Sequence, residues 1–531
     1  MSSAPQNAAP PNAPAPVSAV REVEMKLLLD PRDLPRVPDL PALKTVAEGP
    51  PAVRFLRTVY YDTPDRRLFA GGVALRVRQE GDRFVQTLKT LNAAASGDSA
   101  AVAIRKEWDW TVSTESPDMA PLDAEGVAAL VPEDARKALV PLFTTEFQRT
   151  TLLVRPDALT SIEVAVDEGR ITAGNACARI SEVELELKSG RTGRLFDLAL
   201  ALQRSLPARI GTESKAEVGY RLVTGRLPAP ALPEPLGLTP VTTVAEAYRH
   251  IVRHGLRLLL ANEACALAGG EVEGLHQMRV ALRRLRTAIR LFRPLTGEPD
   301  ACQAGDGIRW FSRQLGPARD WDVLLSHGVE PFAATAKVPA DTLAALAAAV
   351  REARRAPAQA AVEAIQSPRC TGLILALGSW LEEGAWQSGA AAEVRAQFDR
   401  PMAELSGPWL AAQHAKALKA GRDLDGADAA ARDRLRRRLR KLRHTAEFFR
   451  GLYAETATMP FIAALDAVLG ALDAEHDATV ARDLLRGLSA DQPEHRAAAD
   501  ATARWLAKQA DKRRKALPGL WKTFRDVAVF W

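Results

Sequence analysis

The hydrophobic pattern of the chain changes at about residue 230. From about residue 20 to 222, apolar and polar residues alternate in short runs with a period of two, which is typical of β-strands. Helical periodicity is confined there to two longer stretches, near 124–140 and 191–205. The strands are predicted at 21–29, 53–63, 73–80, 83–90, 102–110, 143–154, 161–168 and 178–188.

Beyond the change, residues 241–531 are rich in Ala, Leu and Arg and have helical periodicity throughout, which predicts an all-α domain. The segment between the strand-like and the helix-like region, LPAPALPEPLGLTP at 227–240, is proline-rich and is predicted to be a stiff linker. Residues 1–19 form an Ala/Pro-rich tail that is expected to be disordered. The pattern therefore predicts an α+β multidomain protein with a strand-rich domain at 20–226 and a helical domain at 241–531.

The composition fits this division. A chain of 531 residues with 47% apolar and 26% charged residues can bury a core in each of two or three domains, which excludes wholesale disorder. No uncharged apolar run reaches the length of a membrane span, and the first 19 residues lack the features of a signal peptide. We therefore expect a cytoplasmic protein with no membrane partner.

The net charge of +6 is unevenly distributed: residues 1–230 sum to −1 and residues 231–531 to +7. Such a bias in the helical half favours anionic partners such as phosphates, nucleic acid or a membrane surface. The four cysteines lie far apart without a CxxC pair, which indicates neither a disulfide framework nor a zinc site.

Charged residues recur at every second position of several predicted strands. Side chains two residues apart point to the same face of a strand, and most of the alternate positions here are apolar. On one strand this pattern usually marks the solvent-exposed face. The set is Glu22, Glu24 and Lys26; Arg76 and Arg78; Arg105, Glu107 and Asp109; Glu182, Glu184 and Glu186.

Four strands with the same pattern favour an enclosed site over four solvated faces. If the sheet curls into a barrel, these acids and bases converge on one lumen. A divalent cation on the carboxylates and a polyphosphate on the bases would neutralise both sets.

Taken together and in order, these residues resemble the CYTH superfamily, the triphosphate tunnel metalloenzymes. The resemblance covers about 200 residues and begins at Glu22-x-Glu24-x-Lys26. It implies an eight-stranded antiparallel β-barrel with a linear triphosphate along its axis. The other matching motifs are VYYDTP at 59–64, LRVR with Arg76 and Arg78, QTLK with Lys89, RKEW with Arg105 and Glu107, Arg149, VDEG with Asp167, EVE with Glu182 and Glu184, and SKAEVGY with Lys215.

The resemblance also implies roles at the matching positions and metal-assisted hydrolysis of inorganic triphosphate. Mg²⁺ or Mn²⁺ is the implied cofactor. Phosphate oxygens would be held by Lys26, Arg76, Arg78, Lys89, Arg105, Arg149 and Lys215. The divalent metal would be held by Glu22, Glu24, Glu107, Asp167, Glu182 and Glu184. Which group activates the attacking water stays open.

The helical half contains an internal repeat in which residue n matches residue n+157. HQMRVALRRLRTAIRLF at 276–292 matches DRLRRRLRKLRHTAEFF at 433–449. On a helical wheel each copy has a charged stripe and a separate apolar face. Two such stripes with few intervening acids favour a groove that binds a polyanion, because arginine bonds phosphate oxygens bidentately. Lys416 and Lys419 are expected to extend this surface.

The motifs LHQMRVALRRLR and LGPARDWDVL resemble the CHAD domain, a helical module associated with inorganic polyphosphate, over about residues 241–531. The family places a histidine at the head of both copies, whereas the second copy here has Asp433, which puts a symmetric two-histidine site in doubt. The residues expected to bind polyphosphate are His276, Arg279, Arg283, Arg286, Arg290, Arg436, Arg440 and Arg443.

Two alternatives stay open at this point. The tunnel could act on another triphosphate, such as thiamine triphosphate or a nucleoside triphosphate, or cyclise ATP. Alternatively, the protein could be a catalytically idle module that binds polyphosphate or another polyanion; nucleic acid is not the expected partner. The absence of a base-binding motif favours inorganic triphosphate.

Overall fold

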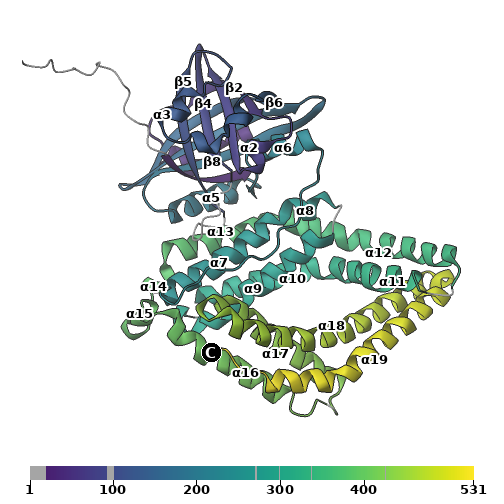
Figure 1. Cartoon of the computed structure of the whole chain (residues 1–531). Helices are drawn as coiled ribbons and strands as arrows, with labels where there is room; N and C mark the ends of the chain where they lie inside the picture. Colours follow the sequence, from purple (N-terminus) through teal and green to yellow (C-terminus); the bar gives the residue numbers. More distant parts are fainter. Residues whose placement is uncertain (1–19, 92–100, 270–271, 298, 336–337, 425) are drawn as a thin grey trace, which may run out of the picture. The chain divides into compact units, whose positions relative to one another are not determined.

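The computed structural model describes residues 20–91, 101–269, 272–297, 299–335, 338–424 and 426–531, so the predicted tail at 1–19 lies outside the described residues. The described chain forms two compact units (Figure 1). The tunnel unit contains residues 20–91, 102–190 and 213–226. The helical unit contains residues 191–212 and the described residues from 227 onward. The segment 191–212 thus belongs to the helical unit, although it lies inside the range predicted for the strand-rich domain.

The tunnel unit is a closed antiparallel barrel of eight strands, which confirms the predicted fold class. The strands are hydrogen-bonded in the order β5-β4-β3-β2-β6-β7-β8-β1, and β1 also pairs with β5, so that the barrel has no open edge. Their bounds are β1 (Val20–Leu28), β2 (Ala52–Asp62), β3 (Val73–Glu80), β4 (Arg83–Thr90), β5 (Ala103–Val112), β6 (Val140–Asp157), β7 (Thr160–Ala173) and β8 (Ala176–Ser189).

Alternation along the strands separates a polar lumen from an apolar outer face. Leu75 and Val77 of β3 are buried in an apolar cluster with residues of α3 and α4, whereas Arg76 between them lines a cavity inside the barrel. The same alternation holds for buried Met25 and its cavity-lining neighbour Glu24 on β1. Alternation therefore places these apolar side chains outside the lumen and their charged neighbours inside it, while a second apolar cluster that includes Tyr60 and Phe147 forms part of the lumen wall.

Short helices cover parts of the barrel. The prediction of one long helix at 124–140 is wrong: this region holds three short turns of helix separated by Gly126, in a left-handed conformation with φ 70°, and by Pro132. The short helices are η1 (Leu34–Asp39), α1 (Pro41–Lys44), α2 (Arg67–Ala70), α3 (Ala120–Ala124), η2 (Ala128–Leu130) and α4 (Glu133–Arg136).

Helix α6 (Lys215–Thr224) completes the tunnel unit and was not among the predicted elements. It begins with a capping box in which the Ser214 hydroxyl accepts from the Glu217 amide and the Glu217 carboxylate accepts from the Ser214 amide. It ends at Gly225, whose φ of 62° suits glycine. Tyr220 packs in a cluster that includes Tyr60 and Phe147 of the lumen wall, so α6 is fixed against the inside of the barrel.

The helical unit contains long helices joined by short ones (Figure 1). Residues 227–240 form neither helix nor strand. The bounds are α5 (Gly193–Ser205), β9 (Arg209–Gly211), α7 (Val244–Ala261), α8 (Glu263–Ala268), α9 (Val272–Thr296), α10 (Pro299–Val323), η3 (Leu324–Val329), α11 (Glu330–Ala333), α12 (Ala340–Gln366), α13 (Pro368–Glu383), α14 (Ala385–Ser388), α15 (Ala392–Phe398), α16 (Met402–Ala420), α17 (Ala429–Phe449), η4 (Arg450–Leu452), α18 (Glu455–Asp491), η5 (Pro493–His495) and α19 (Arg496–Asp526).

The repeated arginine segments form helices α9 and α17, as predicted. Their apolar faces are buried: Leu282, Leu285 and Phe292 on α9, and Leu439 and Leu442 on α17, are at most 1% exposed. The opposite, arginine-bearing faces are therefore held in fixed directions by packing.

One helix of the described chain, α18, is long and apolar enough to cross a membrane by length and composition alone. Its residues Phe461, Leu465 and Leu485 are buried within the helical unit, and α18 packs along α19 and α17. Such burial is typical of a core helix.

Candidate functional sites: a charged tunnel and a basic groove

A cavity of about 370 Å³ lies inside the barrel, and most of its lining side chains are charged. Every second residue of each strand points into the lumen, so acids and bases from different strands meet there. The charged residues of the described chain that line it are Glu22, Glu24, Lys26, Arg76, Arg78, Lys89, Arg105, Glu107, Asp109, Arg149, Glu163, Glu184, Glu186, Lys188 and Lys215.

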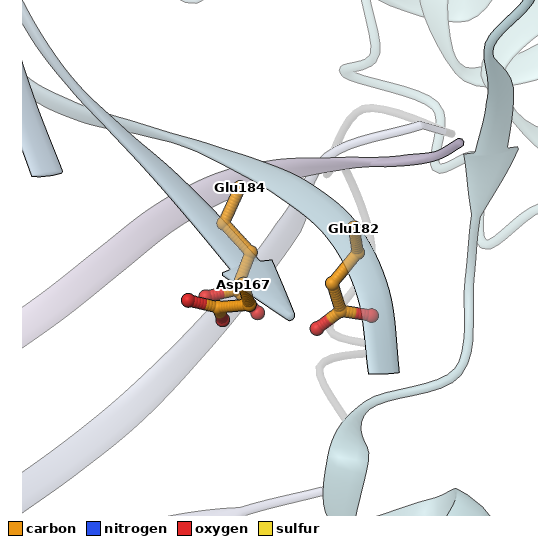
Figure 2. A group of neighbouring side chains, drawn as sticks. All are labelled: Asp167, Glu182 and Glu184. Carbon is orange, nitrogen blue, oxygen red and sulfur yellow. The ribbon is translucent and has the colours of Figure 1, made fainter. Parts of the chain in front are cut away.

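On one side of the tunnel three carboxylates, Asp167, Glu182 and Glu184, form a cluster that we call the acid trio (Figure 2). Asp167 of β7 lies directly opposite Glu182 of β8, and Glu184 is two residues further along the same face of β8. One oxygen from each carboxylate lies within 4.8 Å of the others. Asp167 is fully buried and Glu182 is 7% exposed.

Three cations of the same unit neutralise the acid trio. The Lys215 ammonium, on the first turn of α6, lies 2.7 Å from Asp167 Oδ2 and 2.9 Å from Glu184 Oε1 and also bonds Glu182. Lys26 Nζ lies 3.0 Å from Glu182 Oε1. Arg149 donates from Nε to Asp167 at 2.7 Å and also bonds Glu184. Although burial opposes the charged form, the surrounding carboxylates raise the pKa of Lys215, so this ammonium stays charged.

The opposite side of the tunnel has a second set of ion pairs. The Lys89 ammonium bonds both Glu22 and Glu107, and Arg76 Nη2 lies 2.9 Å from Glu107 Oε1. Arg105 Nη1 donates to Glu24 Oε1 at 2.5 Å. Acids and bases of β1, β3, β4 and β5 thus balance one another, both between adjacent strands and between strands one further apart.

The two carboxylates that share Lys89 have opposite pKa shifts. Burial, reinforced by the nearby charges of Glu24 and Glu107, raises the pKa of Glu22 to about 7. Burial would also raise the pKa of Glu107, but Arg76 and Lys89 lower it to about 2. Glu22 is therefore the carboxylate of this pair that binds a proton near neutral pH.

Among the tunnel cations with a shifted pKa, Arg78 is the one whose positive charge is least balanced by neighbouring carboxylates. Burial, together with the positive charges of Arg76 and Arg149, lowers the pKa of Arg78 to about 10. Its ion pair with Glu80 is long, at 3.6 Å. A bound anion beside Arg78 would relieve this repulsion.

The residues present fit a divalent cation. Carboxylate oxygens are the ligands that Mg²⁺ and Mn²⁺ prefer, and the acid trio supplies three of them on one face of the sheet. The other wall adds Glu22, Glu24 and Glu107. Both groups of carboxylates now hold ammonium or guanidinium groups, so a metal would share or replace those partners.

The helical unit contains a different cavity, of about 1060 Å³, which we call the basic groove. Within the described chain, every charged side chain that lines it is basic. The lining residues come from α9, α16 and α17: Arg283, Arg286, Thr287, Arg290, Lys416, Lys419, Ala420, Arg434, Arg436, Arg437, Arg438, Arg440, Lys441 and His444.

Burial and repulsion between positive charges lower the pKa values of residues that line the basic groove. Burial, then the charges of Arg440 and Arg279, lower the pKa of Arg283 to about 9. Burial, then Lys416 and Arg290, lower the pKa of Lys441 to about 8. Such shifts are expected where like charges are held close together without an anion.

Two family models match the chain in the order of its two units. The CYTH domain model matches residues 20–220, and the CHAD domain model matches residues 250–486. The chain is a CYTH domain followed by a CHAD domain. The CYTH match covers most of the tunnel unit and also residues 191–212 of the helical unit, whereas the CHAD match lies within the helical unit.

Known proteins are similar to each part. The chain is 35% identical to the inorganic triphosphatase of Haemophilus influenzae over 204 residues, and this alignment covers 38% of the chain and 55% of the relative. The chain thus spans about half the length of this relative. The solved CHAD domain of the plant Ricinus communis is 31% identical, with a TM-score of 0.50, over 57% of this chain and 99% of that one.

A solved protein from Hippeastrum, described as an adenylyl cyclase candidate with a dominant triphosphatase activity, is 18% identical over 39% of this chain and 97% of that one. Its TM-score is 0.27.

The CYTH tunnel brings the predicted site residues together. Every cation predicted there lines the cavity, as do Glu22, Glu24, Glu107 and Glu184. Asp167 and Glu182 are absent from the lining but contact Lys215 directly. Their roles toward metal and phosphate stay predictions.

The CHAD groove contains only part of the predicted set. Arg283, Arg286, Arg290, Arg436 and Arg440 line it, whereas His276, Arg279 and Arg443 do not. Arg279 donates instead to the Gly316 carbonyl at 3.1 Å, and Arg443 pairs with Asp466 and with Glu447.

Arginines of the second stripe pair with acids. Arg440 donates to Asp473 at 2.6 Å, and Arg436 donates to Asp433 at 2.7 Å. Asp473 lies on α18, far from α17 in sequence, so the helical wheel of α17 alone could not reveal this pairing.

Sequence reasoning missed several groove residues on α17: Arg434, Arg437, Arg438, Lys441 and His444. The high density of basic residues in RLRRRLRKLRH was the signal that could have indicated them, because so many arginines cannot all lie on one stripe of a helix.

Proposed function

We propose that the CYTH tunnel hydrolyses inorganic triphosphate with a divalent metal, Mg²⁺ or Mn²⁺, and that the CHAD groove binds inorganic polyphosphate. The observation that carries the first part is the cavity inside the barrel whose walls combine carboxylates with lysines and arginines. A linear chain of phosphates with a metal is the ligand that complements both sets of charge. The similarity to an inorganic triphosphatase supports this substrate class.

The tunnel residues bind and orient the substrate in this mechanism. Arg76 and Arg78 on β3, together with Arg149 on β6, offer donors to phosphate oxygens from the two strands that flank β2. Lys26, Lys89 and Lys215 add mobile ammonium groups. These cations stabilise the charge that spreads over the transferring phosphoryl group.

The acid trio with Glu22, Glu24 and Glu107 would hold the metal, which would supply Lewis-acid stabilisation of the phosphoryl oxygens. Because acids and bases come from a closed barrel, the bound phosphates would be shielded from most bulk water, which strengthens each ionic contact.

A phosphate-release assay with the full-length chain tests the activity. The substrates are tripolyphosphate, pyrophosphate, long polyphosphate, ATP and thiamine triphosphate, each with Mg²⁺ or Mn²⁺ and with a chelator. We expect tripolyphosphate to be hydrolysed fastest and the chelator to abolish turnover. Faster turnover of ATP or thiamine triphosphate would replace the proposed substrate.

Variants Glu24→Gln and Lys26→Ala locate the activity in the tunnel. Each removes a charge that lines the cavity, and we expect kcat/KM for tripolyphosphate to fall by on the order of 100-fold or more. Lys106→Ala is the matched control because its exposed side chain lies on β5 outside the set that lines the cavity. Unchanged turnover in both tunnel variants would remove the site assignment.

The second part of the proposal depends on the all-basic lining of the CHAD groove. Binding of labelled polyphosphate to the full-length chain, with duplex DNA as competitor at equal phosphate concentration, tests it. We expect polyphosphate to be retained. Displacement by DNA would show a generic polyanion-binding surface instead.

A further inference from the structure

The acid trio already holds two ammonium groups in the positions where a metal would bind. Lys215 contacts all three carboxylates, and Lys26 Nζ lies 3.0 Å from Glu182 and 3.4 Å from Glu184. Both lysine side chains are less than a tenth exposed. A divalent cation entering here therefore meets carboxylates that have partners inside the protein.

The backbone that presents Lys215 is firmly held. The Tyr220 hydroxyl donates to the buried Asp62 carboxylate at 3.0 Å, and the Tyr220 ring stacks on Phe69. Asp62 also accepts from backbone amides of the α2 turn, including Leu68 at 2.9 Å. The lysine is thus a fixed anchor with a flexible four-carbon arm, whose ammonium can move to a nearby anion while α6 stays in place.

The charges around the trio balance when the tunnel holds no ligand. Asp167, Glu182 and Glu184 face Lys26, Arg149 and Lys215, one cation for each carboxylate. Adding a divalent cation alone would leave two buried positive charges in excess, which is costly in a low-dielectric site. Adding a triphosphate as well would give the displaced ammonium groups new partners.

We infer that Lys215 is a built-in competitor for the divalent cation, so that metal and triphosphate bind the CYTH tunnel cooperatively. Triphosphate draws the Lys215 ammonium onto its phosphate oxygens and thereby frees the acid trio for the metal. By linkage, bound metal favours triphosphate by the same factor. The inference rests on the proposed function, because it assumes that a metal and a triphosphate share the tunnel.

The test measures Mn²⁺ binding to the full-length chain without triphosphate, from the electron paramagnetic resonance signal of free Mn²⁺. Lys215→Gln removes the competing charge and leaves a polar, slightly shorter side chain. We expect it to bind Mn²⁺ on the order of tenfold more tightly than the wild type, because a neighbouring charge commonly shifts such equilibria by a factor of this size. Lys106→Gln, which removes one exposed positive charge elsewhere, should change the affinity less than twofold.

Equal or weaker Mn²⁺ binding by Lys215→Gln would overturn the inference, as would equal tightening by Lys106→Gln. The variant leaves the trio with an excess of negative charge, so its stability is measured too. We expect Mn²⁺ to raise the melting temperature of the tunnel unit more in Lys215→Gln than in the wild type, and an equal rise would also contradict the competition.

The cooperativity between metal and triphosphate is tested by measuring Mn²⁺ binding with and without tripolyphosphate. Tripolyphosphate should tighten Mn²⁺ binding by a larger factor in the wild type than in Lys215→Gln; the Mn²⁺–tripolyphosphate complex in solution contributes equally to both. An equal factor would overturn the cooperative part. Wild-type protein that releases no phosphate from tripolyphosphate with any metal would refute the proposed function, whereas the Mn²⁺ comparison without triphosphate would still decide whether Lys215 competes.

Discussion

The tunnel and the basic groove both gather arginines and lysines, but they differ in what surrounds them. In the tunnel, neighbouring strands alternate bases with acids, so Lys89, Lys215 and Arg149 each have carboxylate partners. In the groove, all charged lining residues within the described chain are basic. Charges in the tunnel therefore support the fold, whereas charges in the groove repel one another and favour an incoming anion.

The largest expected effect comes from breaking the balance in the tunnel. Asp167→Asn removes a fully buried charge that accepts from Arg149 at 2.6 Å and from Lys215 at 2.7 Å. Breaking a buried pair leaves an uncompensated charge, so we expect a loss of ~3–5 kcal/mol in the free energy of unfolding of the tunnel unit. Hydrogen exchange of β7 and β8 amides measures it, and unchanged protection would contradict the stabilising role of these pairs.

Removing a charge from the basic groove should have the opposite effect on stability. Arg283→Gln removes one of the crowded positive charges, so we expect the helical unit to gain about 1 kcal/mol of stability while polyphosphate binds about tenfold more weakly. Thermal unfolding and a polyphosphate titration measure the two effects. The matched control is Arg355→Gln on α12, whose exposed side chain pairs with Glu352 on its own helix and should change neither. A destabilised Arg283→Gln would show that the groove charges support the fold as those of the tunnel do.

A smaller effect on polyphosphate binding is expected from the difference in ion pairing between the two walls of the groove, formed by α17 and α9. Among the described residues, ion pairs with carboxylates are found for Arg436 and Arg440 of α17 but not for Arg283, Arg286 or Arg290 of α9. Asp473 competes with phosphate for Arg440, so Asp473→Asn should tighten polyphosphate binding about threefold to tenfold.

The control for this gain of affinity is Asp483→Asn on the same helix, because Asp483 pairs with the exposed Arg486. Weaker polyphosphate binding by Asp473→Asn would mean that Asp473 positions Arg440 for phosphate instead of competing with it.

The smallest effect concerns pH. The pKa of Lys441 in the free groove is lowered to about 8 by burial, Lys416 and Arg290, and a bound polyanion would raise it again. Polyphosphate affinity should therefore fall as the pH rises through about 8, by at most about tenfold per pH unit from this group. Over the same interval the stability of the helical unit should rise, because the unfolded lysine keeps its proton to higher pH. Lys441→Arg should flatten both profiles, and parallel profiles in wild type and variant would exclude Lys441 as the group.

Much of the tunnel was predictable because its signals are local. The bounds predicted for β3 and β4 agree with the structure, since alternation over 73–80 and 83–90 is interrupted only by the turn at Gly81 and Asp82. The inward faces followed from spacing alone, as Glu22, Glu24 and Lys26 show.

What the sequence did not reveal depends on partners that lie far apart along the chain. Lys215 meets the acid trio only through α6, for which Ser214 and Glu217 were the available capping signal. The pairing of Arg440 with Asp473 joins α17 to α18, and periodicity within one helix carries no information about a neighbouring helix. Ion pairs between residues far apart along the chain are thus the part of the site that only the three-dimensional structure revealed.

The assignment of α5 to the helical unit has a practical consequence for dissecting the protein. After β8 the chain leaves the barrel, packs α5 against α13, and returns to the barrel to place Lys215. A truncated fragment ending at 190 would be a barrel without this lysine. One ending at 226 would expose the apolar face formed by Leu195, Phe196 and Leu202, which invites aggregation. The tunnel unit therefore has no single cut site, and an excised version would need α5 redesigned with a polar face.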